Sequence, residues 1–396
     1  MPIPSPFHPR TSAQCRSLRW KDWSGYFAVC AYDTYPDREY YAIRHAAGLI
    51  DVTPLYKYEV HGPDAAAFLA RVIAKNILKL EVAQVTYCCW CDERGKLLDD
   101  GTVSRLSDTY FRVTAAEPSL AWLTQHAGTF DVQIEESTET IAALAIQGPN
   151  ARDILKQVTD ADVAGLRFFR LTKANIDGFE TVVTRTGYTG DLGYEVWVPN
   201  ENAVALWDAL MNAGRTYGIE PAGLDALDVT RVEAGFIMNG VDYFSANHCL
   251  IESRMSTPYE TGLGWTVNLD REPFIGQGPL RSEKNTGPMR KFVGLELDWD
   301  EFARLHAKHN LPPEVCSAAW RNAVPVYTAR GTHVGQATSG AWSPTLKKNL
   351  ALATILAPHA KVGTTLRMEV TVEYVRHTVA AVVSKRPFFD PPRKRA

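Results

Sequence analysis

The sequence predicts an α+β protein made of two similar α+β units followed by a separate antiparallel β domain. The first observation is a repeat: residues 60–73 and 141–155 both read as an apolar strand, a Gly-Pro stop and a helix. The second is a change of character after about Gly278, where short strands follow one another with turn residues at regular spacing. Such spacing is typical of an antiparallel barrel or sandwich.

The first unit is predicted over residues 1–140, with part of 220–280 packing back on it. Residues up to about Trp23 are rich in Pro and Ser, which indicates an arm on the surface and outside the core. A short helical pattern precedes the strand LIDVT, and Asp64 caps the helix AAAFLARVIA. The segment VTYCCWCDERGKLLDDGTVSRL then alternates as two strands about a turn, which predicts a β-hairpin that YFRVTAA continues.

The second unit is predicted over residues 141–220. It runs through the strand FETVVT, a Gly-rich loop and the strand YEVWV to the amphipathic helix ENAVALWDALMNAGRTYG. A further helix is expected over 222–234. Residues 281–396 form the predicted β domain, and DEFARLHAKHN interrupts its strands with helical periodicity, so we expect an inserted helix near 300–310.

Composition excludes several classes of function. The chain has 396 residues, 45% hydrophobic and 22% charged, which is enough for several globular cores. Its 42 basic and 45 acidic side chains leave no net positive field, so no nucleic-acid partner and no membrane partner are expected. No apolar run approaches the roughly 20 residues of a membrane span, and no signal-peptide core is visible. We therefore expect a cytoplasmic protein.

The Gly-rich loop is the first candidate binding segment. Gly187, Gly190 and Gly193 stand three apart between two strands, a pattern that lets the backbone approach a flat or anionic ligand. The spacing is not that of a dinucleotide or P-loop fingerprint, and a plain tight hairpin is the alternative. Glu195 follows in an apolar strand, where a carboxylate is costly unless it meets donors such as a pair of ligand N–H groups. An outward-facing strand residue is the alternative there.

Two adjacent carboxylates follow an apolar pair on the predicted hairpin. Because side chains alternate along a strand, Asp99 and Asp100 point to opposite faces and only one can line a pocket. A buried carboxylate there could accept a proton or stabilise a cationic one-carbon intermediate. The alternative is an ordinary residue at the end of a strand.

Metal binding is not expected. Cys88, Cys89 and Cys91 lie on one strand without a second ligand cluster, so core packing explains them better. His306 and His309 on the expected inserted helix come without a partner motif and are expected to be solvated. The odd total of seven cysteines also indicates free thiols instead of a disulfide framework.

Taken in order, the segments resemble the folate-binding aminomethyltransferase family, which includes the glycine cleavage T-protein and tetrahydrofolate-dependent demethylases such as dimethylsulfoniopropionate demethylase. The resemblance spans nearly the whole chain. It rests on LIDVT with VHGPDA, YCCWCDERGKLLDD, AIQGPNA, TRTGYTGDLGYE, PAGLDALDVTRVEAG, STPYETGLGWTV, QATSGAWSPTLKKNLALA and the PF near the end. It implies a three-lobed fold of two α+β lobes and a C-terminal β-barrel, with tetrahydrofolate as cofactor in a central channel.

The resemblance also implies roles for single residues. Asp100 matches the catalytic aspartate near the folate, and Glu195 matches the glutamate that holds the pterin. Tyr87 and Tyr188 match aromatic pocket positions, and Arg231 matches an arginine of the helix after PAGL. The four residues besides Asp100 are therefore expected to bind the cofactor.

Several positions depart from the family pattern. The family's Asp-Val-Ser-His-Met-Gly is here DVTPLY, so Pro54, Leu55 and Tyr56 replace polar residues near the reaction centre. An asparagine of the T-protein is Thr114, and an arginine of the helix after PAGL is Leu227. These changes predict a more apolar donor pocket, in which Tyr56 contacts the substrate by facing a soft cation.

The departures favour a demethylase that moves a methyl group from a small S-, N- or O-methylated donor to tetrahydrofolate. We expect the inserted helix 300–310, which ordinary T-proteins lack, to cover the route that a carrier-bound arm would take. The alternative is the aminomethyltransferase of the glycine cleavage system, with a lipoyl carrier protein as partner. A non-catalytic folate-binding protein is a second alternative, although the retained Asp100 and the absence of Cys in VTRVEAG speak against it.

Overall fold

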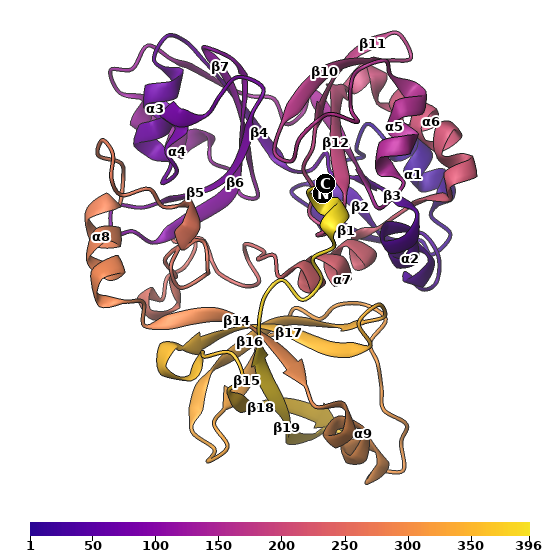
Figure 1. Ribbon diagram of the computed structural model, residues 1–396, viewed down its shortest axis with the longest axis vertical. Coiled ribbons are helices and arrows are strands. Elements are labelled where there is room, and N and C mark those ends of the chain that lie inside the picture. The colour runs from indigo at the N-terminus through magenta and orange to yellow at the C-terminus, as the bar shows by residue number, and fades with distance from the viewer.

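The computed structural model describes residues 1–396 and contains three lobes (Figure 1). Two α+β lobes lie side by side at the top of the view, and a β-barrel lies below them. Helix α7 (Leu224–Ala234) lies between the second lobe and the barrel. The predicted fold class, two α+β lobes and an antiparallel barrel, is confirmed.

The first lobe is a five-stranded antiparallel sheet in the order β5-β6-β7-β4-β8. Two helices cover one face, where Tyr58, Phe68 and Val113 belong to a single apolar core. The other face turns toward the second lobe and the barrel. The elements are β4 (Tyr56–His61), α3 (Ala65–Val72), β5 (Val85–Cys91), β6 (Leu97–Ser107), β7 (Tyr110–Ala115), α4 (Leu120–Ala127) and β8 (Gln133–Glu136).

The second lobe is a six-stranded sheet in the order β10-β11-β12-β9-β3-β13, in which only β13 and β3 run parallel. Helices on its outer face bury a core that includes Trp207, Ile154 and Val196. The elements are α1 (His8–Gln14), α2 (Asp37–His45), β3 (Ala47–Asp51), β9 (Ile141–Gln147), α5 (Ala151–Val158), β10 (Leu171–Ile176), β11 (Phe179–Thr184), β12 (Gly193–Pro199), α6 (Ala203–Gly214) and β13 (Ile219–Pro221).

The N-terminal segment differs from the expectation in two ways. It is not an arm outside the core, because Phe7 is fully buried with its ring 6.2 Å from that of Trp207, and the hairpin β1 (Arg19–Trp23) and β2 (Tyr26–Ala31) packs on α7. Strand β3 also pairs with β9 and β13, so residues 1–51 belong to the second lobe and not to the first. The Pro- and Ser-rich composition concealed the few apolar anchors that fix this segment.

The predicted repeat is present in three dimensions. Gly62 follows β4 with φ +131°, and Gly148 follows β9 with φ +135°. A Cβ atom at Gly62 would lie 2.3 Å from the carbonyl oxygen of Asp131, and one at Gly148 would lie 2.6 Å from that of Ala46. Each lobe therefore turns from strand into helix by the same step, which only glycine tolerates.

The C-terminal domain is a closed six-stranded barrel in the order β14-β17-β16-β15-β18-β19, which settles the choice between barrel and sandwich. The elements are β14 (Arg290–Leu297), α9 (Trp299–Ala307), β15 (Val324–Tyr327), β16 (His333–Ser343), β17 (Lys348–Leu356), β18 (Thr365–Val372) and β19 (Val375–Ser384). Before the barrel, α8 (Gln277–Thr286) lies below the first lobe, and Ile275 packs in that lobe's core. None of the helices combines the length and the apolarity that crossing a membrane requires.

Short 3-10 turns link these elements: η1 (Ile77–Lys79), η2 (Asn200–Asn202), η3 (Arg215–Tyr217), η4 (Glu252–Arg254), η5 (Gly264–Thr266), η6 (Ala357–His359) and η7 (Pro392–Lys394). The lobes share one large apolar core, which we call the central cluster. It contains Cys89 of β5, Ala145 of β9, Val229 of α7 and Leu350 of β17. Side chains on the inner faces of both upper lobes therefore point toward a common region.

Candidate functional site

The inner face of the first lobe presents Tyr87 and Asp100. Tyr87 packs against the central cluster, whereas its neighbour Cys88 belongs to the core under α3 and α4. On β6, Asp100 pairs with Cys89, so it shares the inner face with Tyr87. The Tyr87 hydroxyl donates a hydrogen bond to Asp100 Oδ2. Both side chains are half-buried and keep contact with solvent.

Asp100 is held by two phenols. Tyr243, from the segment that follows α7, donates its hydroxyl to Asp100 Oδ1. Burial raises the pKa of the Asp100 carboxyl, and the hydrogen bonds from Tyr243 and Tyr87 oppose part of that rise. A carboxylate in this setting can accept a proton more readily than one in water.

The neighbouring carboxylate has a structural environment. Asp99 is fully buried, and its Oδ2 accepts hydrogen bonds from the backbone N–H groups of Ala116 at 2.9 Å and Glu117 at 2.8 Å. Asn239 Nδ2 donates to Asp99 Oδ1 at 2.8 Å. Burial and the adjacent charge of Asp100 raise the pKa of Asp99. Asp99 thus ties β6 to the segment after β7 and leaves Asp100 as the carboxylate with solvent access.

Glu195 presents the second half-buried carboxylate, from β12 of the second lobe. Its Oε2 accepts hydrogen bonds from the hydroxyls of Thr186 at 2.7 Å and Thr184 at 3.5 Å, while no protein donor reaches Oε1. Burial raises the pKa of the Glu195 carboxyl, and the two threonine hydrogen bonds lower it in part. One oxygen is thus fixed by the protein and the other is left for a ligand.

The Gly-rich loop before Glu195 is tightly packed. Thr189 Oγ1 donates to Gln147 Oε1 at 2.8 Å, and Gln147 Nε2 donates to the carbonyl of Thr186 at 3.2 Å. Gly190 has φ +75°, and a Cβ there would lie 2.5 Å from the Cβ of Ala234 on α7. Gln147 on one side and Ala234 on the other therefore fix the conformation of the loop, which is not a free hairpin turn.

Aromatic rings flank the two carboxylates. Trp265 stacks on Tyr87 with ring centroids 5.9 Å apart and an interplanar angle of 21°, and its side chain is 59% exposed. Phe236 lies 5.6 Å from the ring of Tyr188, and the Tyr188 hydroxyl donates to the carbonyl of Ile237. These rings provide flat apolar surfaces beside Asp100 and on the loop that leads to Glu195.

Arg231 differs from the expected ligand-binding arginine because protein groups take up most of its donors. It is fully buried, and its guanidinium donates to Asp228 at 2.6 Å, to Asp242 at 2.6 Å and to Ser339 at 3.1 Å. Only Nη2 has no partner. Arg231 mainly joins α7 to strand β16 of the barrel, and its remaining donor atom, Nη2, is buried.

The structure does not bring Tyr56 to this region. Tyr56 pairs with Ala115 on β7 and packs against the core under α3 and α4, on the sheet face opposite Asp100. The expectation that it faces a donor is therefore corrected. Its neighbour Lys57 lies on the inner face instead, and the sequence analysis did not single it out.

Lys57 is fully buried, and its Nζ donates to the carbonyls of Thr53 at 2.6 Å and Leu55 at 2.8 Å. Burial, and then the nearby charge of Arg112, lower the pKa of Lys57 to about 7. Beside it on the same face, Thr114 forms a 2.7 Å hydrogen bond with Thr102.

The inserted helix also lies elsewhere. Helix α9 packs through Phe302 and Leu305 on β18 and β19 at the lower end of the barrel, away from the two upper lobes (Figure 1). The expectation that this helix covers the route of a carrier-bound arm to the region between the upper lobes is therefore corrected. The segment after it does return toward the centre, where Arg321 Nε donates to Asp228 on α7 at 2.6 Å.

The inner-face arrangement can be compared with known proteins. Residues 13–271 match the family described as the GCVT N-terminal domain, and residues 290–390 match the glycine cleavage T-protein C-terminal barrel domain. The chain belongs to the aminomethyltransferase family. Family members are tetrahydrofolate-dependent enzymes, so the predicted enzyme class and cofactor are confirmed.

Curated relatives of this family match nearly full length. The aminomethyltransferase of Caldanaerobacter subterraneus is 38% identical over 330 residues, covering 82% of this chain and 81% of that protein. The Bacillus subtilis aminomethyltransferase is 35% identical over 358 residues, covering 89% and 90%. The crystal structure of glycine cleavage system aminomethyltransferase T from Bartonella henselae has a TM-score of 0.83 at 24% identity, covering 98% and 99%, and it supports the fold.

The family cofactor fits the side chains present. A pterin is flat and has an edge with parallel N–H donors, which a carboxylate oxygen without a protein partner can accept. Glu195 Oε1 is such an atom, and Tyr87, Trp265, Tyr188 and Phe236 supply aromatic faces. No group of three or more His, Cys, Asp or Glu side chains is arranged to hold a metal ion.

Sequence reasoning missed Tyr243, Trp265, Phe236 and Lys57. Trp265 stands in GLGWTV, a segment that supports the family resemblance but does not mark the tryptophan as a pocket residue. Tyr243 lies in a run of turn residues with no periodicity, so no local signal could have linked it to Asp100.

Proposed function

We propose that this chain is the aminomethyltransferase of a glycine cleavage system, transferring a one-carbon unit from an aminomethyl group on a lipoyl carrier protein to tetrahydrofolate. The observation that carries the proposal is Asp100, a half-buried carboxylate with two phenol donors on the inner face that turns toward the second lobe. The relatives named aminomethyltransferase support it, since they match more than four-fifths of the chain.

Tetrahydrofolate supplies the nitrogen atoms that accept the one-carbon unit. In this proposal Glu195 binds the N–H edge of the pterin through Oε1, while Thr186 fixes Oε2. Tyr87 and Tyr188 contact the ring faces. Asp100 accepts a proton from the acceptor nitrogen or stabilises positive charge beside it, and its raised pKa suits both roles.

The demethylase hypothesis is a second candidate. Two of its arguments are weakened, because Tyr56 points into the core of the first lobe and α9 lies away from the centre. One observation still favours it: Leu227, which replaces an arginine of the family, is buried in the central cluster with Leu55 packed against that cluster. An apolar wall of this kind suits a methylated sulfonium, amine or aryl ether.

The two candidates differ in product. For the aminomethyltransferase, purified enzyme with tetrahydrofolate and aminomethylated lipoyl carrier protein should release ammonia and form 5,10-methylene-tetrahydrofolate. An ammonia assay detects the first product, and mass spectrometry detects the second. Parallel reactions receive methylated sulfonium, betaine, amine and aryl-ether compounds. Formation of 5-methyl-tetrahydrofolate from one of these, without ammonia release from the carrier, would decide for the demethylase. Asp100→Asn serves as the control that links either product to this site.

A further inference from the structure

The C-terminal strap, residues 385–396, leaves the barrel and crosses α7 to reach the second lobe (Figure 1). The backbone N–H groups of Phe388 and Phe389 both donate to the carbonyl of Glu233 at 2.9 Å. Arg386 donates to the carbonyl of Gly235 at 3.0 Å. The strap is therefore fastened along the C-terminal end of α7 before it reaches the Gly-rich loop.

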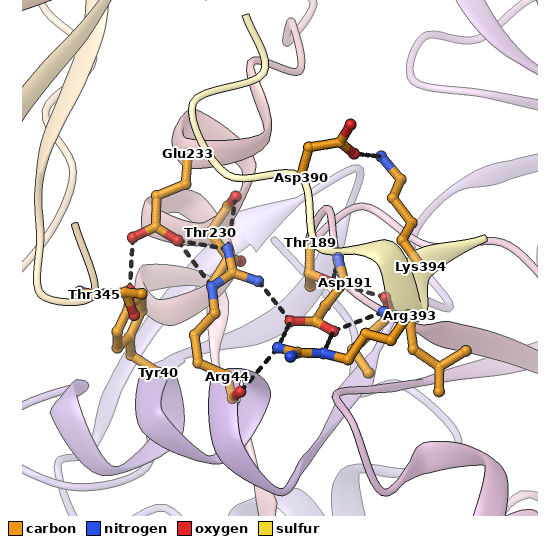
Figure 2. A network of polar contacts seen from close by, with 12 residues as sticks. Tyr40, Arg44, Thr189, Asp191, Thr230, Glu233, Thr345, Asp390, Arg393 and Lys394 are labelled. Atoms are coloured by element: carbon orange, nitrogen blue, oxygen red, sulfur yellow. Dashed lines mark hydrogen bonds and ion pairs between the residues drawn. The ribbon is translucent and has the colours of Figure 1, made fainter. Parts of the chain in front are cut away.

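Arg393 of the strap binds the loop directly. Its Nε donates to Asp191 Oδ1 at 2.6 Å and its Nη2 donates to Oδ2 at 2.8 Å, a bidentate pair (Figure 2). Arg44 of α2 approaches Asp191 Oδ2 from another side at 3.4 Å. Bidentate geometry fixes both the position and the orientation of the Asp191 carboxylate.

This contact is part of a closed charge network. Arg44 donates to Glu233 Oε2 at 2.5 and 2.8 Å, and Tyr40 and Ser343 donate to Glu233 Oε1 at 2.6 and 2.5 Å. Figure 2 shows how Asp191 and Glu233 lie on either side of the Arg44 guanidinium. Two carboxylates thus face two guanidiniums.

The balance of this network depends on Arg393. The side chains of Arg44, Asp191 and Glu233 are 0–1% exposed, whereas that of Arg393 is 38% exposed. Without Arg393, the longer contact with Arg44 would be the only remaining contact of the buried Asp191 carboxylate with a cationic side chain. A buried charge that loses its close partner is strongly destabilising, so the loop would have to move.

Movement of this loop would reach the candidate site. Asp191 lies between Tyr188 and Glu195 in the sequence. The Leu192 N–H donates to Asp191 Oδ1 at 2.8 Å, so the carboxylate orients the backbone that enters β12. Gly190 packs on Ala234, so the loop cannot shift toward α7 to compensate.

We propose that Arg393 is a positioning residue, which fixes the loop 187–193 and through it Tyr188 and Glu195, so that the strap sets the affinity for reduced folate. The inference deepens the proposed function and rests on it. Arg393 touches neither carboxylate of the site, and its effect passes through Asp191.

The test compares Arg393→Ala and Arg393→Lys with Arg395→Ala. Arg395 is the matched control, because it lies on the same strap and pairs only with Asp390 at 2.9 Å. Calorimetry with tetrahydrofolate should give a Kd raised about tenfold or more in Arg393→Ala, less in Arg393→Lys, and unchanged in Arg395→Ala. At saturating folate, kcat should stay within about threefold of wild type, which separates a binding effect from a chemical one.

Two readouts distinguish positioning from general stability. Hydrogen exchange of residues 186–193 should quicken in Arg393→Ala and not in Arg395→Ala, without any ligand present. Added guanidinium at millimolar concentration should restore part of the folate affinity of Arg393→Ala, since the site of the lost group is partly exposed.

Two results would contradict the positioning role of Arg393. Wild-type folate affinity in Arg393→Ala, with only a lower melting temperature, would make Arg393 merely structural. If Arg393→Ala does not fold, Arg393→Lys decides, and unchanged affinity and loop exchange in that variant would equally overturn it. Wild-type enzyme that fails to bind tetrahydrofolate would sink the proposed function, and the exchange experiment would still judge the strap separately.

Discussion

The hydroxyl of Tyr243 donates a hydrogen bond to the carboxylate of Asp100, across 143 positions of the sequence. Because the bond favours the ionised carboxylate, Tyr243→Phe should raise the pKa of Asp100. We expect the acidic limb of the pH–rate profile to move to higher pH, and kcat to fall about tenfold. Tyr56→Phe, on the other face of the same sheet, is the control, and an equal shift in that variant would contradict the assignment.

Asp100→Asn should lower kcat by about two orders of magnitude or more while the Kd for tetrahydrofolate stays within a few-fold, as expected for a positioned proton acceptor. Single-turnover kinetics with calorimetry on the same preparation would measure both. A loss of folate binding as large as the loss of turnover would instead place Asp100 in cofactor binding.

Asp99→Asn should act on stability. Asp99 accepts two backbone N–H groups and the Asn239 amide while fully buried. An amide NH2 in place of one oxygen leaves donors facing donors, which costs about 1–3 kcal/mol. Denaturant unfolding would measure this loss, and a variant as stable as wild type would contradict the structural role.

Glu195→Gln should weaken tetrahydrofolate binding by about ten- to a hundredfold, or roughly 1.5–3 kcal/mol, because an amide cannot present two acceptor oxygens. Glu180→Gln on the exposed part of β11 is the matched control. Equal affinities for the two variants would remove Glu195 from the site.

Lys57 should make stability depend on pH. The folded-state pKa is lowered to about 7 from 10.5, so between these values the unfolded chain holds a proton that the folded chain has lost. Stability therefore rises with pH across that window, by at most about 1.4 kcal/mol per pH unit from this group. Lys57→Met should flatten the rise, as measured by urea unfolding between pH 6.5 and 10 (roughly the window of the two pKa values). An identical slope in both proteins would show that Lys57 is charged in the fold.

Local sequence was sufficient for the lobes and insufficient for parts of the site. The Gly-Pro steps at Gly62 and Gly148 specify a backbone turn that no other residue type adopts, so the repeat was visible without any contact information. The sheet face on which Tyr56 lies could not be predicted from local sequence. The turn before β4 decides which of the neighbours Tyr56 and Lys57 points inward, and it is Lys57. The place of the N-terminal segment was not predictable for a related reason, since a few buried side chains such as Phe7 and Cys15 anchor a segment that is rich in Pro and Ser.

The two site carboxylates belong to different lobes, Asp100 to the first and Glu195 to the second. A ligand that touches both acts as a cross-link between two lobes, whose other contacts include the backbone hydrogen bond from Val85 N–H to the carbonyl of Phe169 at 2.9 Å and the packing of Arg112 over the ring of Trp197 at 5.7 Å. The affinity for such a ligand then depends on the distance between the two lobes. Substitutions at that seam that touch neither carboxylate should therefore change affinity, by changing the distance between the two lobes before the ligand binds.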